Sequence, residues 1–257
     1  EEAKMKDDKV GLDTITSRLL LLFWFSLFTV SSVCMVLLNK YCITKFPHPF
    51  SILCFQNFTT IALNLMGSVV GIFKIHSFTQ AQFRMFIFPT FLFVAMLATS
   101  LIALPTVSIA TTVVFRAAST CLVAFGDSVF FRRQFSHAEL SCLFLVLVGA
   151  FIYAAGDIAF DRKGYAWMLL NSLMFTSSQL YEKWAVVKLD QTAVGISCVQ
   201  NIMSLPILVA LGFATHEDPA RSLATISPFS LVALLVTGLA GCSLSVCYMS
   251  LSKHAAA

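Results

Sequence analysis

Long apolar stretches recur along the whole chain, and they constrain its fold more than any other feature. A helix of about 20 residues crosses the hydrocarbon core of a bilayer, which is about 30 Å thick. Eight stretches are long enough, at about 19–39, 50–73, 85–104, 106–131, 140–156, 165–187, 193–213 and 228–250. Only 12% of the 257 residues are charged, against about a quarter in soluble domains. The sequence therefore predicts an all-α polytopic membrane protein.

The distribution of lysine and arginine predicts the orientation. The N-terminal side of the predicted spans carries ten of them: Lys4, Lys6, Lys9, Arg18, Lys74, Arg84, Arg132, Arg133, Lys188 and Lys253. The opposite side carries five: Lys40, Lys45, Arg162, Lys163 and Arg221. Basic residues gather on the cytosolic side, so residues 1–17 are expected to be a cytosolic segment. Because the net charge of +4 reflects this topology, no nucleic-acid partner is expected.

Two apolar spans contain nearly the same polar motif. Residues 54–57 read "CFQN" and residues 198–201 read "CVQN". Lys40 precedes the glutamine of the first motif by 16 residues, and Lys183 precedes that of the second by 17 residues. Span 1 thus resembles span 6, and span 2 resembles span 7.

A repeating unit of five spans predicts two halves of opposite orientation. An odd number of crossings inverts the second copy, and inverted repeats are typical of secondary transporters with a substrate site near the midplane. The predicted parts are the first repeat, 18–156, and an incomplete second repeat of spans 6–8, 157–257. A ten-helix transporter fold needs two further spans, so we expect the sequence to be a fragment of about eight transmembrane helices.

The four amides of the motifs are candidate substrate ligands. Gln56 and Asn57 lie about seven residues into span 2, and Gln200 and Asn201 lie as far into span 7 from the other side. Each pair is therefore roughly 10 Å deep. The amides could bind one ligand from two sides, or they could hydrogen-bond neighbouring helices, as amides often do in lipid. The sequence leaves both interpretations open.

Charged side chains within the spans are further candidates. Arg116 lies about 15 Å into span 4, where an ionised group indicates a functional site, and its guanidinium suits phosphate. Asp127 is about 16 Å away along the same helix, too far for a direct ion pair. Lys40 and Lys183 could face a polyanion or extend to the interface, and Glu182 could neutralise part of the charge of Lys183.

Tyr181 in span 6 could stack on a base or simply pack. No Walker-type glycine loop, H-E-x-x-H or G-x-S-x-G motif occurs, so no enzyme activity is expected. The eight cysteines show no C-x-x-C spacing, and buried free thiols are expected. Neither a metal site nor a cofactor is predicted.

Four segments resemble the eukaryotic nucleotide-sugar transporters of the drug/metabolite transporter superfamily. They are "LLNKYCI", "CFQN", the loop "GDIAFDRKGYAW" and "CVQNIMSLPILVALGF". The chain is most similar to the GDP-mannose transporters. In that group span 7 carries Phe-Tyr-Asn-Asn, which contributes to guanine recognition; here only Asn201 matches it, and Gln200 is a conservative difference. A second signature of that group, Gly-Ala-Leu-Asn-Lys in span 9, does not occur in this sequence.

This resemblance implies a Golgi multi-pass antiporter that works by alternating access. It would exchange a cytosolic nucleotide sugar, GDP-mannose-like, for a lumenal nucleoside monophosphate. A UDP-sugar transporter and a triose-phosphate or phosphoenolpyruvate translocator are the alternatives within the superfamily, and a receptor or scaffold is the alternative outside it. The lipid bilayer and a second copy of the chain, in a homodimer, are the expected macromolecular partners.

Overall fold

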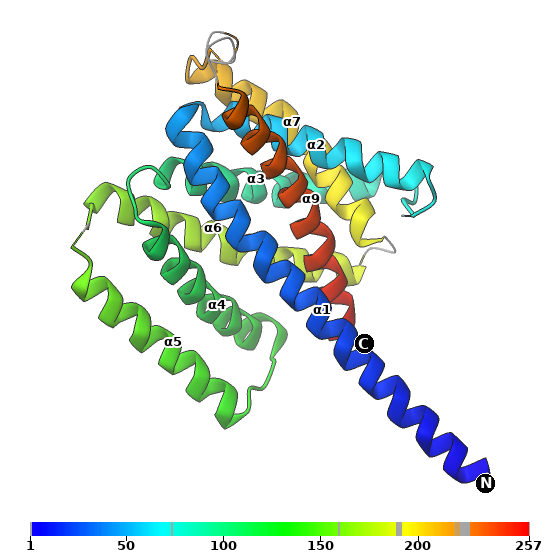
Figure 1. Ribbon diagram of the computed structural model, residues 1–257. Helices are drawn as coiled ribbons and strands as arrows, with labels where there is room; N and C mark the ends of the chain where they lie inside the picture. The colour runs from blue at the N-terminus through cyan, green and yellow to red at the C-terminus, as the bar shows by residue number, and fades with distance from the viewer. Residues whose placement is uncertain are drawn as a thin grey trace.

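The computed structural model is built of α-helices, without strands in the residues it describes: 2–72, 74–158, 160–188, 192–218, 220 and 227–256. Side chains are described within these ranges from Leu19 onward, apart from residues 185–188, 193, 245–246 and 248–256. The helices (Figure 1) are α1 (Glu2–Lys45), α2 (Pro49–Val69), α3 (Gln80–Ala103), α4 (Ile109–Phe131), α5 (His137–Gly156), α6 (Arg162–Lys188), α7 (Ala193–Ala214) and α9 (Pro228–Ala256).

Each of the eight predicted spans coincides with one of these helices. In the described part of the chain, six are long and apolar enough to cross a membrane: α1 from Leu19, α2, α3, α4, α5 and α7 from Val194. The remaining two, α6 and α9, occupy the other predicted spans, and α6 includes charged residues near both of its ends. The prediction of an all-α polytopic membrane protein is confirmed.

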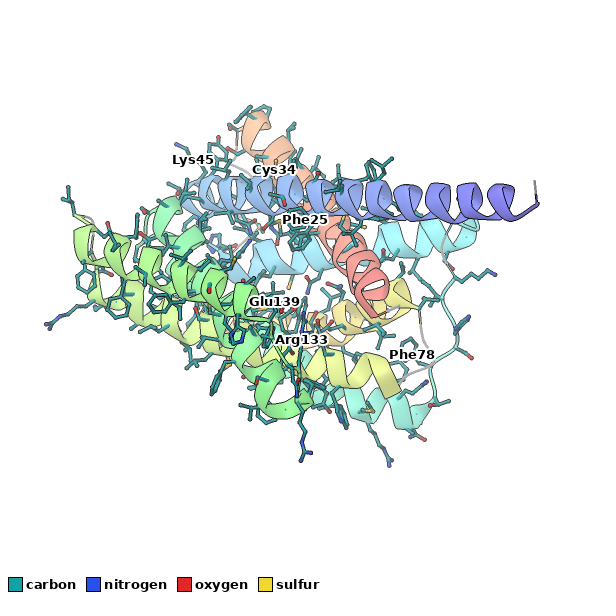
Figure 2. The ribbon with its side chains drawn as sticks, turned by 90° about the horizontal axis from the view of Figure 1, so that it is seen from below. Phe25, Cys34, Lys45, Phe78, Arg133 and Glu139 are labelled. Carbon is teal, nitrogen blue, oxygen red and sulfur yellow. The ribbon has the colours of Figure 1, made fainter. Side chains whose placement is uncertain are left out.

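The charged segment before span 1 continues the first helix. α1 begins at Glu2, so residues 2–17 are helical and not merely an extended polar tail. Its N-terminal turns project beyond the bundle in Figure 1. Phe25, Cys34 and Lys45, labelled in Figure 2, mark the part of α1 that lies along the other helices.

Local sequence signals set the ends of the helices. The side chains of Thr79, Ser108, Ser136 and Thr192 accept hydrogen bonds from the first turns of α3, α4, α5 and α7, which satisfies backbone N–H groups that have no partner within the helix. Pro49 begins α2, where its missing N–H has no cost. Such caps are needed in lipid because every backbone polar group must be satisfied within the protein.

The helices pack in a reciprocal pattern. The three most extensive pairings are α1 with α9, α3 with α6, and α2 with α7. Exchanging the halves, so that α1, α2 and α3 trade places with α6, α7 and α9, converts the first pairing into the second and leaves the third unchanged. It also converts the α2–α9 contact into the α3–α7 contact, and both occur. This is the packing expected of two related halves, although the boundary at residue 157 stays a prediction.

A single large cluster of buried apolar side chains joins α1, α2, α3, α7 and α9, and it includes Ile52, Leu53, Leu101 and Leu208. In contrast, α5 has no buried residue among those described, and its packing is chiefly on α4. Lipid and protein are equally apolar surroundings for these side chains, so close packing and interhelical hydrogen bonds hold the helices together.

Candidate functional site

The two glutamines of the repeated motifs make equivalent hydrogen bonds. Gln56 Nε2 on α2 donates to Asn39 Oδ1 on α1 at 2.8 Å. Gln200 Nε2 on α7 donates to Glu182 Oε1 on α6 at 3.1 Å. Each acceptor immediately precedes a candidate lysine, Lys40 or Lys183. The same polar cluster therefore occurs once in each predicted half, with a neutral acceptor in the first and a carboxylate in the second.

The neighbouring asparagines differ from each other. Asn57 Nδ2 donates across the α2–α7 interface to Ser204 Oγ at 2.7 Å. Asn201 Nδ2 instead donates within α7 to the carbonyl oxygen of Ser197, also at 2.7 Å. Both asparagines are only 4% exposed, and Gln56 and Gln200 are 3% exposed. In this conformation all four amides bond protein groups, and Asn57 links two helices.

Lys40 closes the end of α3. Its ammonium donates to the carbonyl oxygen of Leu104 at 2.9 Å and to that of Val107. Carbonyls at a helix C-terminus lack partners within the helix, and a lysine there satisfies them and the helix dipole. Lys40 thus faces backbone oxygens in the turn between α3 and α4, and it does not extend away from the bundle.

The acidic loop before α6 packs against the same turn. Asp157 Oδ2 accepts from Thr111 Oγ1 at 2.9 Å and from the hydroxyl of Tyr165 at 2.6 Å, which joins α4 to α6. Asp161 Oδ2 accepts from the backbone N–H of Gly164 at 2.6 Å and caps α6. A Cβ at Gly164 would lie 2.6 Å from Thr106 Oγ1, so any other residue would force its neighbours to shift. Four positions of the "GDxxFDxxGYxW" pattern, Asp157, Asp161, Gly164 and Tyr165, therefore have local structural roles.

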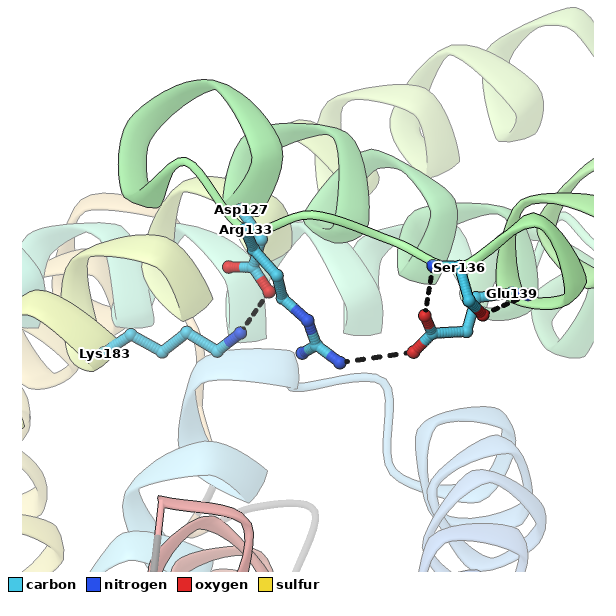
Figure 3. Close-up of polar contacts among 5 residues, drawn as sticks. All are labelled: Asp127, Arg133, Ser136, Glu139 and Lys183. Atoms are coloured by element: carbon cyan, nitrogen blue, oxygen red, sulfur yellow. Dashed lines mark hydrogen bonds and ion pairs between the residues drawn. The ribbon is translucent and has the colours of Figure 1, made fainter.

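Lys183 forms an ion pair with Asp127 of α4, drawn in Figure 3. The side chain of Asp127 is 6% exposed and that of Lys183 is 38% exposed. Asp127 Oδ1 has no hydrogen-bond partner among the described residues. The expectation that Glu182 neutralises Lys183 is not met, because Glu182 accepts a hydrogen bond from Gln200 and the charge on Lys183 is balanced by Asp127 of another helix.

Arg116 donates through Nη1 to Ser32 Oγ on α1 at 2.7 Å. It is exposed, and no ion pair joins it to a described carboxylate, in agreement with the predicted separation from Asp127. Measured from the start of α4 at Ile109, Arg116 is roughly 10 Å along the helix, somewhat less deep than predicted.

Tyr181 packs against other aromatic rings. Its ring centroid lies 5.5 Å from that of Phe88 and 5.1 Å from that of Trp184. Its hydroxyl reaches the carbonyl oxygen of Met85 at 3.5 Å. In this conformation Tyr181 therefore packs against protein side chains, which is the second of the two predicted roles.

The eight candidate substrate residues lie in separate groups and do not form one continuous site in this conformation. The amides join α1 to α2, α2 to α7 and α6 to α7 by hydrogen bonds, whereas Arg116 bonds Ser32 of α1 and, among the described residues, is hydrogen-bonded to none of the amides. Sequence reasoning missed Asn39 and Asp127 as partners. Asn39 had a signal, since it occupies the position before Lys40 that Glu182 occupies before Lys183. Asp127 had none, because its partner lies on a different helix, 56 residues away.

The sequence was compared with known proteins. Residues 16–255 match the profile of the Triose-phosphate Transporter family. GDP-fucose transporter 1 of Arabidopsis thaliana is 30% identical over 193 residues, which are 74% of this chain and 56% of that protein. GDP-mannose transporter GONST1 of Arabidopsis thaliana is 24% identical over 199 residues, 74% of this chain and 60% of its own length. GDP-mannose transporter 1 of Saccharomyces cerevisiae (strain ATCC 204508 / S288c) is 23% identical over 238 residues, which are 84% of this chain and 71% of that protein.

The chain therefore spans little more than half the length of the first of these relatives. The family match, in contrast, covers almost all of the chain, including every described helix apart from the first turns of α1 and the end of α9. This multi-pass membrane protein belongs to the Triose-phosphate Transporter family.

Proposed function

We propose that this protein transports a nucleotide sugar across the Golgi membrane by alternating access, in exchange for a nucleoside monophosphate. A GDP-sugar, GDP-mannose-like, is the proposed substrate, because relatives at 22–30% identity are named GDP-fucose and GDP-mannose transporters. The proposed orientation has the N-terminus in the cytosol, following the excess of basic residues on that side.

The duplicated polar cluster is the observation that carries this proposal. A lysine, a glutamine and an acceptor for that glutamine occur on α1 and α2 and again on α6 and α7. In a carrier with inverted halves, equivalent groups can approach one substrate from opposite sides, and the halves can rock around it. A receptor or scaffold would not require such a pair of clusters.

Two of the three charged candidates bond neutral acceptors, whereas Lys183 is paired with the carboxylate of Asp127. Arg116 donates to a hydroxyl, and Lys40 donates to backbone carbonyls. A phosphate is an anionic acceptor that adds charge attraction which a hydroxyl or a carbonyl lacks, so a diphosphate can replace these two neutral partners. We assign the substrate to Lys40, Gln56, Asn57, Arg116, Tyr181, Lys183, Gln200 and Asn201, with Arg116 and the lysines on phosphate and the amides on the base and sugar.

Counterflow in proteoliposomes tests the proposal. Vesicles containing the purified protein are preloaded with GMP, and uptake of labelled GDP-mannose is measured in competition with GDP-fucose, UDP-sugars and triose phosphate. GDP-sugars are expected to compete best. Preference for UDP-sugars or triose phosphate would identify one of the two alternatives instead, and no exchange with any of these compounds would refute the proposal.

Arg116→Ala is the matched test of the site. It is expected to abolish counterflow, whereas Arg133→Ala, which removes an exposed arginine paired with Glu139 at the protein surface, is expected to leave it intact. Unchanged exchange by the Arg116 variant would remove Arg116 from the site. Homodimer formation stays a separate prediction.

A further inference from the structure

A cavity of about 500 Å³ lies between α2, α7 and α9, at the end of the bundle where α2 and α9 begin and α7 ends. Phe50 and Cys54 from α2, Leu208 and Gly212 from α7, and Leu234 from α9 line it. Its volume is within the roughly 300–1,000 Å³ of small-molecule sites. None of the eight candidate substrate residues lines this cavity.

Among the described residues, Glu217 is the one charged group that lines the cavity, and it already has hydrogen-bond partners. Glu217, which follows α7, accepts hydrogen bonds from the backbone N–H of Phe50 at 3.0 Å and from that of Ser51 at 2.8 Å. Its Oε2 also accepts from Ser51 Oγ at 2.6 Å. The start of α2 therefore balances this carboxylate, as helix N-termini do for anions. A phosphate would meet a negative charge here, so the cavity is unsuited to a nucleotide and suited to an uncharged apolar group.

The cavity opens onto the exposed apolar surface of the bundle, which in a membrane protein is the surface that lipid covers. Val209, Phe213 and Leu231 also line it, and they are 45%, 77% and 42% exposed. Spacings of three and four residues, as between Phe50 and Cys54, place the lining side chains in one stripe along each helix. A slot that runs along the helices and meets the bilayer favours a flexible hydrocarbon chain. We propose that this cavity binds one acyl chain of a bilayer phospholipid.

Photo-crosslinking tests this site directly. The full protein is reconstituted with phosphatidylcholine that carries a diazirine on its acyl chain, irradiated, and mapped by mass spectrometry. Phe50 and Leu234 are 6% and 4% exposed, so bulk lipid reaches them poorly, and labelling of these two residues is expected. Labels confined to exposed side chains such as Phe213 and those of α5 would overturn the proposal.

Gly212→Leu is the matched variant. A Cβ at Gly212 would have its nearest contacts at 3.7 Å from Phe50 Cβ and 3.9 Å from Glu217 Oε2, so a larger side chain enters the cavity without a severe clash. Gly149→Leu on α5 is the control, because nothing lies within 4 Å of a Cβ there. We expect Gly212→Leu to lose the labels on Phe50 and Leu234 and Gly149→Leu to keep both. Retention of both labels in a folded Gly212→Leu protein would refute the site.

Cys54 provides a measurement on the wild-type protein that does not depend on any variant. This partly exposed thiol lines the cavity, so N-ethylmaleimide should alkylate it in detergent. Added phosphatidylcholine is expected to slow that reaction, while the exposed Cys142 of α5 serves as the reference thiol in the same sample. Equal slowing at both cysteines, or no slowing at Cys54, would contradict an occupied cavity.

Discussion

Breaking the ion pair between Lys183 and Asp127 should destabilise the protein by an amount that depends on which partner is removed. In Lys183→Met, Asp127 keeps its buried position and loses its only described partner, since its Oδ1 already has none. An uncompensated buried charge costs about 3–5 kcal/mol. In Asp127→Asn the remaining charge is on Lys183, whose side chain is 38% exposed, and the cost is about 1–3 kcal/mol.

The double variant separates this explanation from a general loss of packing. Lys183→Met combined with Asp127→Asn leaves no charge unpaired, so it should be less destabilised than the sum of the single variants by about 1–3 kcal/mol. Thermal unfolding of the purified protein in detergent measures all three. At about 2–4 °C per kcal/mol, the Lys183→Met variant should lose roughly 10 °C in Tm.

Arg133→Met is the control, because Arg133 and Glu139 form an ion pair at 3.5 Å with side chains that are 54% and 47% exposed (Figure 3). An exposed pair is worth about 1 kcal/mol or less. Equal losses of Tm in Arg133→Met and Lys183→Met would refute the reasoning from burial. Additive effects in the double variant would refute the pairing itself.

Three further substitutions test the contacts around the turns by the same thermal assay. Gly164→Ala would bring a Cβ to 2.6 Å from Thr106 Oγ1 and should lower the stability by about 1–3 kcal/mol. Gly149→Ala is the control and should be neutral. Equal Tm values for the two variants would contradict the close approach at Gly164. Glu217→Ala removes the acceptor of three hydrogen bonds from the start of α2 and should cost about 2–3 kcal/mol, with the Gln variant retaining part of the stability. Asp157→Ala removes the acceptor shared by α4 and α6 and should cost about 2–3 kcal/mol, and a Tm like that of wild type would show that this link is dispensable.

Sequence patterns predicted the helices well because helix formation in a membrane is a local requirement. Each span must be long and apolar enough to cross the bilayer, and each helix must satisfy its own backbone. The predicted span 193–213 and the helix Ala193–Ala214 differ by a single residue. The sequence did not predict that the charged segment before span 1 continues the first helix, because no feature of its composition distinguished a helix from a polar tail.

The equivalence of the two glutamines was also visible in the sequence, since repeated spacing requires no knowledge of the packing. Their partners were not. Asn39 of α1 accepts from Gln56 of α2, and Glu182 of α6 accepts from Gln200 of α7. Only the packing of the helices brings these side chains within reach of each other.

By itself, the sequence determined the extent of the described helices, and it predicts two related halves. The tertiary structure decided which charges pair, which amides are buried, and where a cavity remains. In a soluble protein the apolar face of a helix reveals its inner side. In lipid both faces are apolar, so the sequence does not show which neighbour a helix contacts, and the pairing of Lys183 with Asp127 becomes known only when α4 and α6 are placed together.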